Sequence, residues 1–170
     1  RHFVEQSILN SKLPFTILQV GSYMQNMLPA WTKMAETGVH RMAYDIDAPM
    51  SLVDLDDVSE AAVKVLADDG FANGMFEIAG PVISLRQKAA ILSSVLGTEI
   101  VAEKEPLNAF LDHGRVLGFS DFTLATMAKM FPYYDDHGLV GSDKALGWIL
   151  GREPTDFETF ARRTAAALNQ

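Results

Sequence analysis

The residues best placed to do chemistry stand directly after the first buried strand that the sequence predicts. Phe15–Val20 is short, apolar and partly β-branched, which is typical of a buried strand, and Gly21 breaks the pattern. In open α/β sheets, ligands bind beyond the carboxyl ends of the strands. Gly21 would let a flat ring approach the backbone, and Ser22, Tyr23 and Asn26 offer hydrogen bonds. We therefore expect a ligand site here, against the alternative that these polar groups only satisfy local backbone.

A second group of candidates follows in the same stretch of chain. Met24, Met27, Met34 and Trp31 would suit an apolar substrate cavity, because methionine adapts to irregular shapes. A methionine-rich stripe is also what ordinary core packing produces. The sequence leaves both interpretations open.

Two further stretches carry acidic residues. Asp54–Asp57 has the composition of a metal or acid–base cluster, but acidic residues also cap helices, where the helix dipole favours negative charge. Asp57 with Glu60 three residues later predicts a capping pair. Phe131–Gly138 predicts an aromatic, acidic loop that would either cover a pocket, with His137 titrating near neutral pH, or pack on the surface by its own aromatics.

Several familiar catalytic signatures are absent from the sequence. It contains no G-x-x-G-x-x-G or G-x-G-x-x-G loop, no G-K-[ST] phosphate loop, no G-x-S-x-G elbow and no H-E-x-x-H. No tyrosine is followed four residues later by lysine, and there is no cysteine. The four histidines are far apart in sequence, so we expect no metal site. The catalytic residues stay unknown at this stage.

The charge balance limits the class of partner. The formal net charge is −8, and the 14 basic residues are scattered. Nucleic acids and anionic membranes attract clustered lysine and arginine, so we expect neither as a partner. No apolar run approaches the roughly 20 residues that span a bilayer. A cytoplasmic location is expected, since the lack of cysteine suits a reducing compartment.

The elements that must position these residues alternate between helix and strand as far as Pro106. The expected strands in this part span 15–20, 41–46, 51–55, 75–79 and 99–103. The expected helices span 1–10, 23–37, the residues from Asp57 to the Asp68–Gly70 turn, and those from Ser84 to Leu96. Gly38 and Gly97 are expected to end the second and the fourth of these helices, and Ser84 with Gln87 predicts a capping box for the fourth. Alternation of this kind predicts an α/β fold with a mainly parallel sheet. After Pro106 we expect helices over 107–117, 122–131 and 142–150, and a last helix opened by a capping box at Thr155–Glu158.

The domain organisation follows from this order of elements. We expect one domain over residues 1–170, with the late strands and helices of the sheet in 1–106 and a mainly helical lobe in 107–170. Because residue 1 is Arg1 within a predicted helix, and no nucleotide-binding βα unit precedes Phe15–Val20, the chain is expected to be the carboxyl-terminal part of a larger doubly wound fold. The open edge of that strand would then be an aggregation risk in the isolated chain.

Five stretches of the chain carry a family resemblance: Val4–Leu18, Tyr23–Asn26, Ser51–Ala62, Glu77–Pro81 and Leu150–Phe157. Together they resemble the NmrA-like family of atypical short-chain dehydrogenase/reductases. The resemblance covers nearly the whole chain in the family's order. It implies a Rossmann-type domain that binds NADP or NAD, with a glycine-rich loop that these residues do not contain. It also implies a small helical lobe on the substrate side.

The resemblance further implies roles for individual residues. The residues it places beside the nicotinamide are Gln19, Val20, Gly21, Ser22 and Tyr23. The residues that we expect at the substrate pocket, from their types and their place after that strand, are Met24, Asn26, Met27 and Trp31. Family members of one kind reduce quinones, dyes or other small acceptors with NAD(P)H. Others bind the dinucleotide as redox-sensing regulators that contact a protein partner. The expected function is therefore an NAD(P)-dependent oxidoreductase, with a non-catalytic sensor as the alternative.

Overall fold

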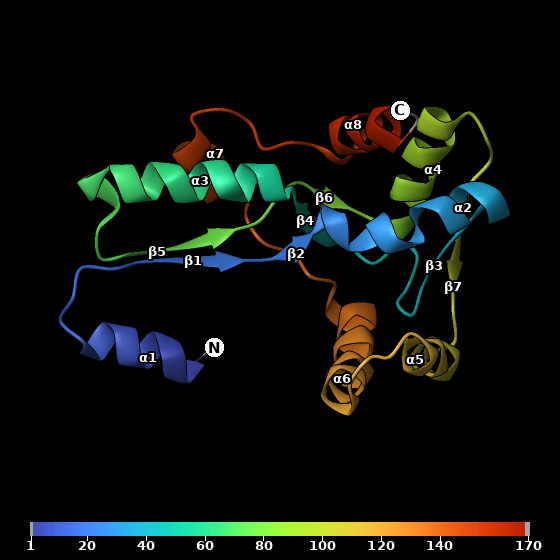
Figure 1. The fold of residues 1–170 in the computed structure, drawn as a ribbon, viewed down its shortest axis with the longest axis horizontal. Coiled ribbons are helices and arrows are strands. Elements are labelled where there is room, and N and C mark those ends of the chain that lie inside the picture. The colour runs from blue at the N-terminus through green and yellow to red at the C-terminus, as the bar shows by residue number, and fades with distance from the viewer. Residues whose placement is uncertain (1, 169–170) are drawn as a thin grey trace. The chain divides into compact units, whose positions relative to one another are not determined.

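A computed structural model describes residues 2–168 of the protein, in which helices alternate with short parallel strands (Figure 1). The chain forms two compact units, and each unit is assembled from three separate stretches. Unit 1 comprises Arg1–Gln25, Ser51–Pro81 and Gly141–Asp156, and unit 2 comprises Asn26–Met50, Val82–Val140 and Phe157–Gln170. The predicted division near residue 106 stays a prediction.

Unit 1 is built around two parallel strand pairs. Its elements are α1 (His2–Asn10), β1 (Thr16–Val20), β2 (Ser22–Tyr23), most of β4 (Met50–Val53), α3 (Leu55–Ala67), the 3-10 helix η2 (Asp69–Phe71), β5 (Gly74–Ile78) and α7 (Lys144–Leu150). β1 pairs with β5 in a register that places Val20 beside Ile78, and β2 pairs with β4 with Ser22 beside Leu52. The parallel pairing confirms the α/β class that the alternation predicts.

The core of unit 1 lies between these strands and the helices α3 and α7. Its buried residues are Val53, Ala61, Val65, Ile78, Leu146, Ile149 and Leu150. α3 packs against α7, and α7 packs against β5. Gly80 is required beside this core, because a Cβ at that position would stand 1.9 Å from the carbonyl oxygen of Leu52. Each buried valine, leucine or isoleucine of this core stabilises the fold by about 1.5–3 kcal/mol.

Unit 2 holds the third parallel pair and most of the helices. Its elements are most of the 3-10 helix η1 (Met24–Ala30), α2 (Trp31–Thr37), β3 (Val39–Met42), β6 (Val82–Ile83), α4 (Leu85–Leu96), β7 (Val101–Lys104), α5 (Leu107–Val116), α6 (Asp121–His137) and α8 (Phe157–Leu168). β3 pairs with β7, and α4 packs against α8 and both of these strands. The capping box of Ser84 with Gln87 is present, and Gly97 ends α4 with φ 68°.

The aromatic, acidic segment after Phe131 is helical, so the predicted loop is wrong. α6 continues through Pro132 to His137 and ends at Gly138. Proline disfavours a helix interior, but tertiary packing outweighs that preference here. Phe131 is buried against Phe110, with ring centroids 4.9 Å apart. Tyr133 and His137 then share one helix, with ring centroids 4.7 Å apart.

Two predicted caps also differ from the structure. α3 begins at Leu55 and its cap is Asp54, whose side chain accepts from the Asp56 N–H. Asp57 lies inside the first turn and takes other partners. Thr155 does not open α8, which begins at Phe157; its N–H and hydroxyl both donate to Asp57. The local pattern predicted Asp57 and Thr155 as helix caps, but in the folded chain these two residues bond to each other instead.

Smaller differences concern the bounds of elements. The strand expected over 41–46 is β3 at Val39–Met42, and that expected over 51–55 is β4 at Met50–Val53. The helix expected over 23–37 is divided into β2, the 3-10 helix η1 and α2, with Pro29 inside η1. Gly38 ends α2 with φ 69°, as predicted.

Candidate functional site

The chain leaves β1 through Gly21, Ser22 and Tyr23, which together form the strand exit. Immediately after Val20, the N–H of Gly21 donates to the carbonyl oxygen of Ile78 over 3.0 Å, which closes the β1–β5 pair. Gly21 itself is exposed, and a Cβ built on it would meet only that carbonyl, at 3.6 Å. Ser22 and Tyr23 then pair with β4 as half-buried residues. The exit therefore presents open backbone next to two hydroxyl side chains.

The structure brings together the five residues predicted to contact the nicotinamide. Gln19 is exposed and its Nε2 donates to Glu5 Oε1 over 3.2 Å, while Val20 packs partly against the core of unit 1. These two continue directly into the exit of Gly21, Ser22 and Tyr23 within unit 1. Whether they contact a cofactor stays a prediction.

The residues predicted to line a substrate pocket are distributed over both units. Met24 belongs to unit 1 and is buried. Asn26, Met27 and Trp31 belong to unit 2, where Asn26 is exposed, Met27 is half-buried and Trp31 is buried. The burial of Met24 and Trp31 is what the core-packing interpretation expects. Their role at a substrate stays a prediction.

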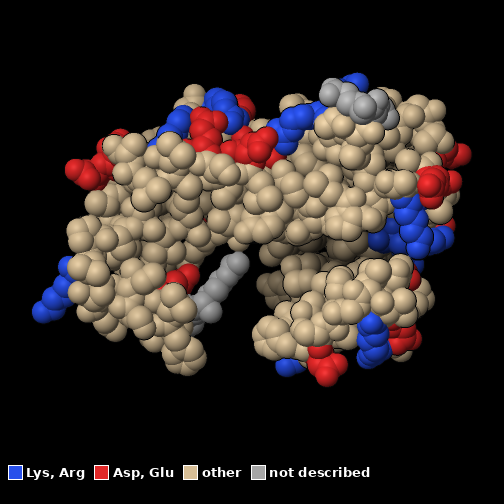
Figure 2. Space-filling view, in the orientation of Figure 1, with Lys and Arg blue, Asp and Glu red and all other residues tan. Residues whose placement is uncertain are grey.

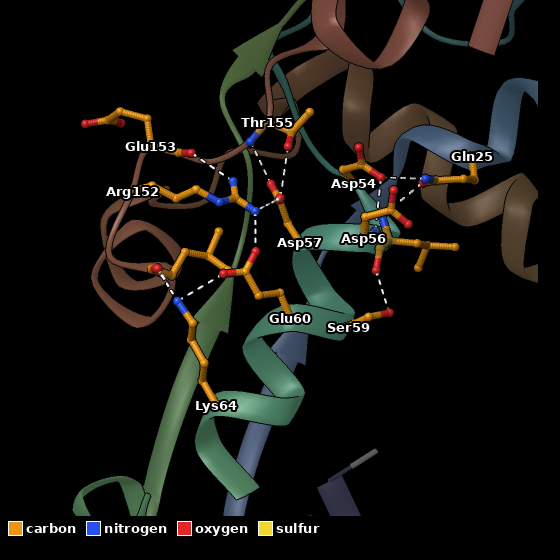
Figure 3. A network of polar contacts seen from close by, with 12 residues as sticks. Gln25, Asp54, Asp56, Asp57, Ser59, Glu60, Lys64, Arg152, Glu153 and Thr155 are labelled. Carbon is orange, nitrogen blue, oxygen red and sulfur yellow. Dashed lines mark hydrogen bonds and ion pairs between the residues drawn. The ribbon is translucent and has the colours of Figure 1, made fainter. Parts of the chain in front are cut away.

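A polar clamp connects the strand exit to the start of α3, and the sequence did not predict it. Gln25 Nε2 donates to Asp54 Oδ1 over 2.7 Å, and Gln25 Oε1 accepts from the N–H of Leu55 over 3.2 Å (Figure 3). Asp54 is fully buried and also accepts from the N–H of Asp56 over 3.1 Å. The clamp thus satisfies two N–H groups of the first turn of α3 that have no partner within the helix.

The second half of the acidic stretch anchors the segment before α8. Asp57 is 1% exposed and accepts from Arg152 Nη2 at 2.8 Å, from the Thr155 N–H at 2.6 Å and from the Thr155 hydroxyl at 2.9 Å (Figure 3). Arg152 also contacts Glu60, which pairs with Lys64. These partners show that the Asp57 carboxylate is part of a structural network rather than a free acid or base.

The network also accounts for the charge visible on this side of unit 1. Figure 2 shows acidic and basic side chains adjacent to one another over α3. Hydrogen bonds from Lys64, and then from Arg152, hold the pKa of Glu60 below its ordinary value. The bonds of Arg152 to Asp57 and Glu60 in turn raise the pKa of the guanidinium. The carboxylates of Asp57 and Glu60 and the basic groups of Lys64 and Arg152 therefore stabilise one another, and this part of α3 has no net positive charge.

Unit 2 contains a buried polar cluster that sequence reasoning missed. His40, Tyr44 and Lys88 are each about 95% or more buried, and Lys88 Nζ lies 3.4 Å from the Tyr44 hydroxyl. Burial lowers the pKa of Lys88 to about 8, and burial with the Lys88 charge lowers the pKa of His40 to about 3. Burial is the main reason why the pKa of Tyr44 is raised, and the neighbouring Tyr134 adds to the effect. No local spacing signals this cluster, because Tyr44 and Lys88 are 44 residues apart.

Within residues 2–168, no three histidine, cysteine, aspartate or glutamate side chains are arranged to hold a metal ion. Over the same part of the chain, no helix has both the length and the apolar character needed to cross a bilayer.

Comparisons with curated proteins identify relatives that are reductases. The NAD(P)H azoreductase of Xenophilus azovorans is 25% identical over 164 residues, which cover 96% of this chain and 57% of that protein. The (4-alkanoyl-5-oxo-2,5-dihydrofuran-3-yl)methyl phosphate reductase of Streptomyces griseus subsp. griseus is 33% identical over 106 residues, 62% of this chain and 37% of that protein. The chain thus spans less than two thirds of the length of these relatives. No protein-family model matches the chain.

Solved structures with the same architecture include dinucleotide-binding proteins. The NADPH-dependent quinone oxidoreductase of Escherichia coli superimposes with a TM-score of 0.84 at 22% identity, over 99% of this chain and 60% of that one. NmrA, a negative transcriptional regulator solved in complex with NADP, superimposes with a TM-score of 0.71 at 16% identity, over 98% and 57%. At the level of the fold, these superpositions confirm the resemblance to NmrA-like proteins: the chain has their Rossmann-like fold over slightly more than half of their length.

Proposed function

We propose that the protein is an NAD(P)-dependent oxidoreductase of the NmrA-like type that reduces a small organic acceptor such as a quinone or an azo dye. The curated relatives named above are reductases, and one of them uses NAD(P)H. A cytoplasmic location is part of the proposal and rests on the sequence. NAD(P)H, when bound, supplies the hydride, and the protein orients the reactants and excludes water.

The observation that carries the proposal is the geometry of the strand exit. In parallel α/β sheets, ligands bind beyond the carboxyl ends of the strands, where the chain turns away from the sheet. The β1–β5 pair ends at Val20 beside Ile78, and the exposed backbone of Gly21 follows at once. Among the described residues, no side chain occupies the space that a Cβ of Gly21 would take. A flat ring would therefore meet bare backbone, with Ser22 and Tyr23 beside it.

These residues fit one part of a dinucleotide. The 170 residues contain no glycine-rich loop for a pyrophosphate, so the proposal assigns to them the nicotinamide side of the cofactor. Within residues 2–168, β1 pairs with β5 alone, and the other edge of β1 carries no strand. We therefore expect the isolated 170-residue chain to bind NAD(P) weakly or not at all, and to aggregate more readily than its longer relatives.

The second candidate is a non-catalytic NAD(P) sensor that contacts a partner protein. NmrA shares the fold and is described as a transcriptional regulator. The Tyr-x-x-x-Lys acid pair of dehydrogenase type is absent from the sequence, and Tyr44 and Lys88, which do contact each other, are both buried in unit 2. The strand exit would serve either function, so turnover is the deciding property.

The first test measures NADPH oxidation by the product of the complete reading frame that encodes this chain. Purified protein is incubated with NADPH or NADH and a panel of quinones and azo dyes, and the loss of absorbance at the reduced-nicotinamide band is followed. An oxidoreductase consumes cofactor only when an acceptor is present. Tight binding of NADPH without turnover of any acceptor would favour the sensor, and no binding at all would overturn both candidates.

A second test addresses the strand exit directly through Gly21→Ala. The added methyl group meets only the Ile78 carbonyl at 3.6 Å, so the fold should tolerate it. We expect the unfolding midpoint to stay unchanged and the Kd for NADPH to rise about tenfold, since a ring can no longer approach the backbone as closely. Gly147→Ala in α7, where the added Cβ would make ordinary contacts, is the matched control. An unchanged Kd in Gly21→Ala would remove the strand exit from the cofactor site.

A further inference from the structure

The segment that leaves β1 is held at both of its ends by hydrogen bonds within unit 1. At its start, the Gly21 N–H donates to the Ile78 carbonyl oxygen over 3.0 Å. At its end, the side-chain amide of Gln25 is bonded through both of its polar atoms, to Asp54 Oδ1 at 2.7 Å and to the Leu55 N–H at 3.2 Å (Figure 3). Met24, next to Gln25, is buried. The residues between these anchors therefore have little freedom to move.

The two partners of Gln25 also fix which way round its amide lies. The Leu55 N–H is a donor and requires the amide oxygen, while the Asp54 carboxylate is an acceptor and requires the amide nitrogen. Asp54 is fully buried and caps α3, so its own position is set by the helix. A glutamate at position 25 would keep the size and the acceptor for Leu55, but would place a second carboxylate against Asp54.

We propose that Gln25 is a positioning residue, whose amide clamps the segment Gly21–Met24 onto the amino terminus of α3 and thereby sets the nicotinamide side of the cofactor site. The role at the cofactor rests on the proposed function. Gln25 does not need to touch the cofactor: it acts by holding Gly21, Ser22 and Tyr23 in the binding geometry before the ligand arrives. Preorganisation of this kind lowers the ordering cost of binding.

A reversal of hydrogen-bond polarity tests the clamp. Gln25→Glu alone sets two carboxylates against each other. Asp54→Asn alone keeps an amide oxygen in the place of Asp54 Oδ1, where it still accepts from Gln25 and from the Asp56 N–H, so this variant removes the charge and leaves the clamp in place. The double variant Gln25→Glu with Asp54→Asn restores the bond between the two side chains, but the Asp56 N–H, which shares Asp54 Oδ1 with Gln25, loses that acceptor. The new amide at position 54 donates to the new carboxylate at position 25, and that carboxylate still accepts from the Leu55 N–H.

The experiment uses the product of the complete reading frame and two readouts. Hydrogen exchange at the amides of Leu55 and of residues 21–25 reports on the clamp without any ligand. NADPH titration and steady-state kinetics report on the site. We expect Gln25→Glu to raise amide exchange and to weaken NADPH binding about tenfold, and the double variant to recover most of that loss. Asp54→Asn alone should stay within about threefold of wild type, which makes it the control for the change at position 54. Gln6→Glu on the exposed face of α1 controls for the added charge.

The outcomes separate this inference from the function on which it rests. If wild type binds and turns over NADPH but the double variant is no better than Gln25→Glu, the polarity of the clamp is irrelevant and the inference is overturned while the function stands. Restored exchange protection without restored NADPH affinity would show a purely structural clamp and would also overturn the positioning role. If wild type binds no dinucleotide, the proposed function falls, and the role at the cofactor falls with it.

Discussion

Asp57 in unit 1 and Lys88 in unit 2 are both ionisable and almost fully buried, yet their surroundings are opposite. The Asp57 carboxylate accepts three hydrogen bonds, from Arg152, the Thr155 backbone and the Thr155 hydroxyl. Within the described part of the chain, the ammonium of Lys88 has a single long contact, to the Tyr44 hydroxyl at 3.4 Å. Nearby, His40 Nε2 has no hydrogen-bond partner among the described residues.

The difference shows how the protein uses burial in two ways. A buried charge costs little when its partners replace the lost water, and the Asp57 network ties separate segments of unit 1 together in this way. Where partners are few, burial shifts the proton equilibrium instead, so the pKa of Lys88 falls to about 8 and the pKa of His40 to about 3. Unit 1 should therefore lose stability when a member of the Asp57 network is removed. Unit 2 should lose stability as the pH falls and its buried basic groups take up protons.

The largest loss of stability should come from removing Asp57, which lies at the centre of the hydrogen-bonded network in unit 1. Asp57→Ala leaves the half-buried N–H of Thr155 without its acceptor and removes one of the two carboxylates that Arg152 contacts, and we expect it to lower the free energy of unfolding by about 3 kcal/mol. The measurement is the urea midpoint at neutral pH. Glu158→Ala breaks the exposed Glu158–Arg162 pair of α8 and should cost no more than about 0.5 kcal/mol. Equal losses in the two variants would show that burial does not distinguish these networks.

A smaller effect should appear in acid at His40. Its folded pKa of about 3 lies below the unfolded value of 6.5, so the unfolded chain binds a proton first, and stability falls as the pH drops from 6.5 towards 3. The slope from this residue is at most about 1.4 kcal/mol per pH unit. The nearby titratable groups Lys88, Tyr44 and Tyr134 keep their protons over this range. His40→Leu should flatten the profile relative to wild type, and parallel profiles of the two proteins would contradict the assignment.

The smallest effect should be a gain in stability at Lys88. Lys88→Met removes the cost of burying an ammonium and should raise the free energy of unfolding by about 1 kcal/mol at neutral pH. The folded pKa of about 8 lies below the unfolded value of 10.5, so wild type itself gains stability as the pH rises from 8 to 10.5. The advantage of the variant should therefore shrink over that window. A variant less stable than wild type at neutral pH would instead show that Lys88 is a well-paired charge.

Much of the local structure could be predicted from the sequence, because it depends on neighbouring residues. The alternation of helix and strand predicted the α/β class, and the strand over 15–20 is β1. Ser84 with Gln87 predicted the cap of α4, and Gly38 and Gly97 predicted the ends of α2 and α4. Hydrophobic periodicity, caps and turn glycines act over roughly three to eight residues, which a linear pattern records.

The candidate site could be predicted only in part. The exit of β1 follows from the end of one strand, so Gly21, Ser22 and Tyr23 were found together. Gln25 lies in the same stretch, but its role could not be predicted, because its partners Asp54 and Leu55 are 29 and 30 residues away. Nothing in the spacing of these residues predicts the clamp, since it depends on how β2 and α3 come together.

The sequence by itself thus determined which elements form and where the chain leaves the first strand, since short-range periodicity and backbone preference encode both. The tertiary structure alone decided the roles of individual polar residues. Asp57 became the anchor of Thr155, 98 residues later in the chain, rather than a cap, and packing of Phe131 carried α6 through Pro132. The physical reason is that a polar group takes the partner that burial brings to it, and burial is a property of the folded chain.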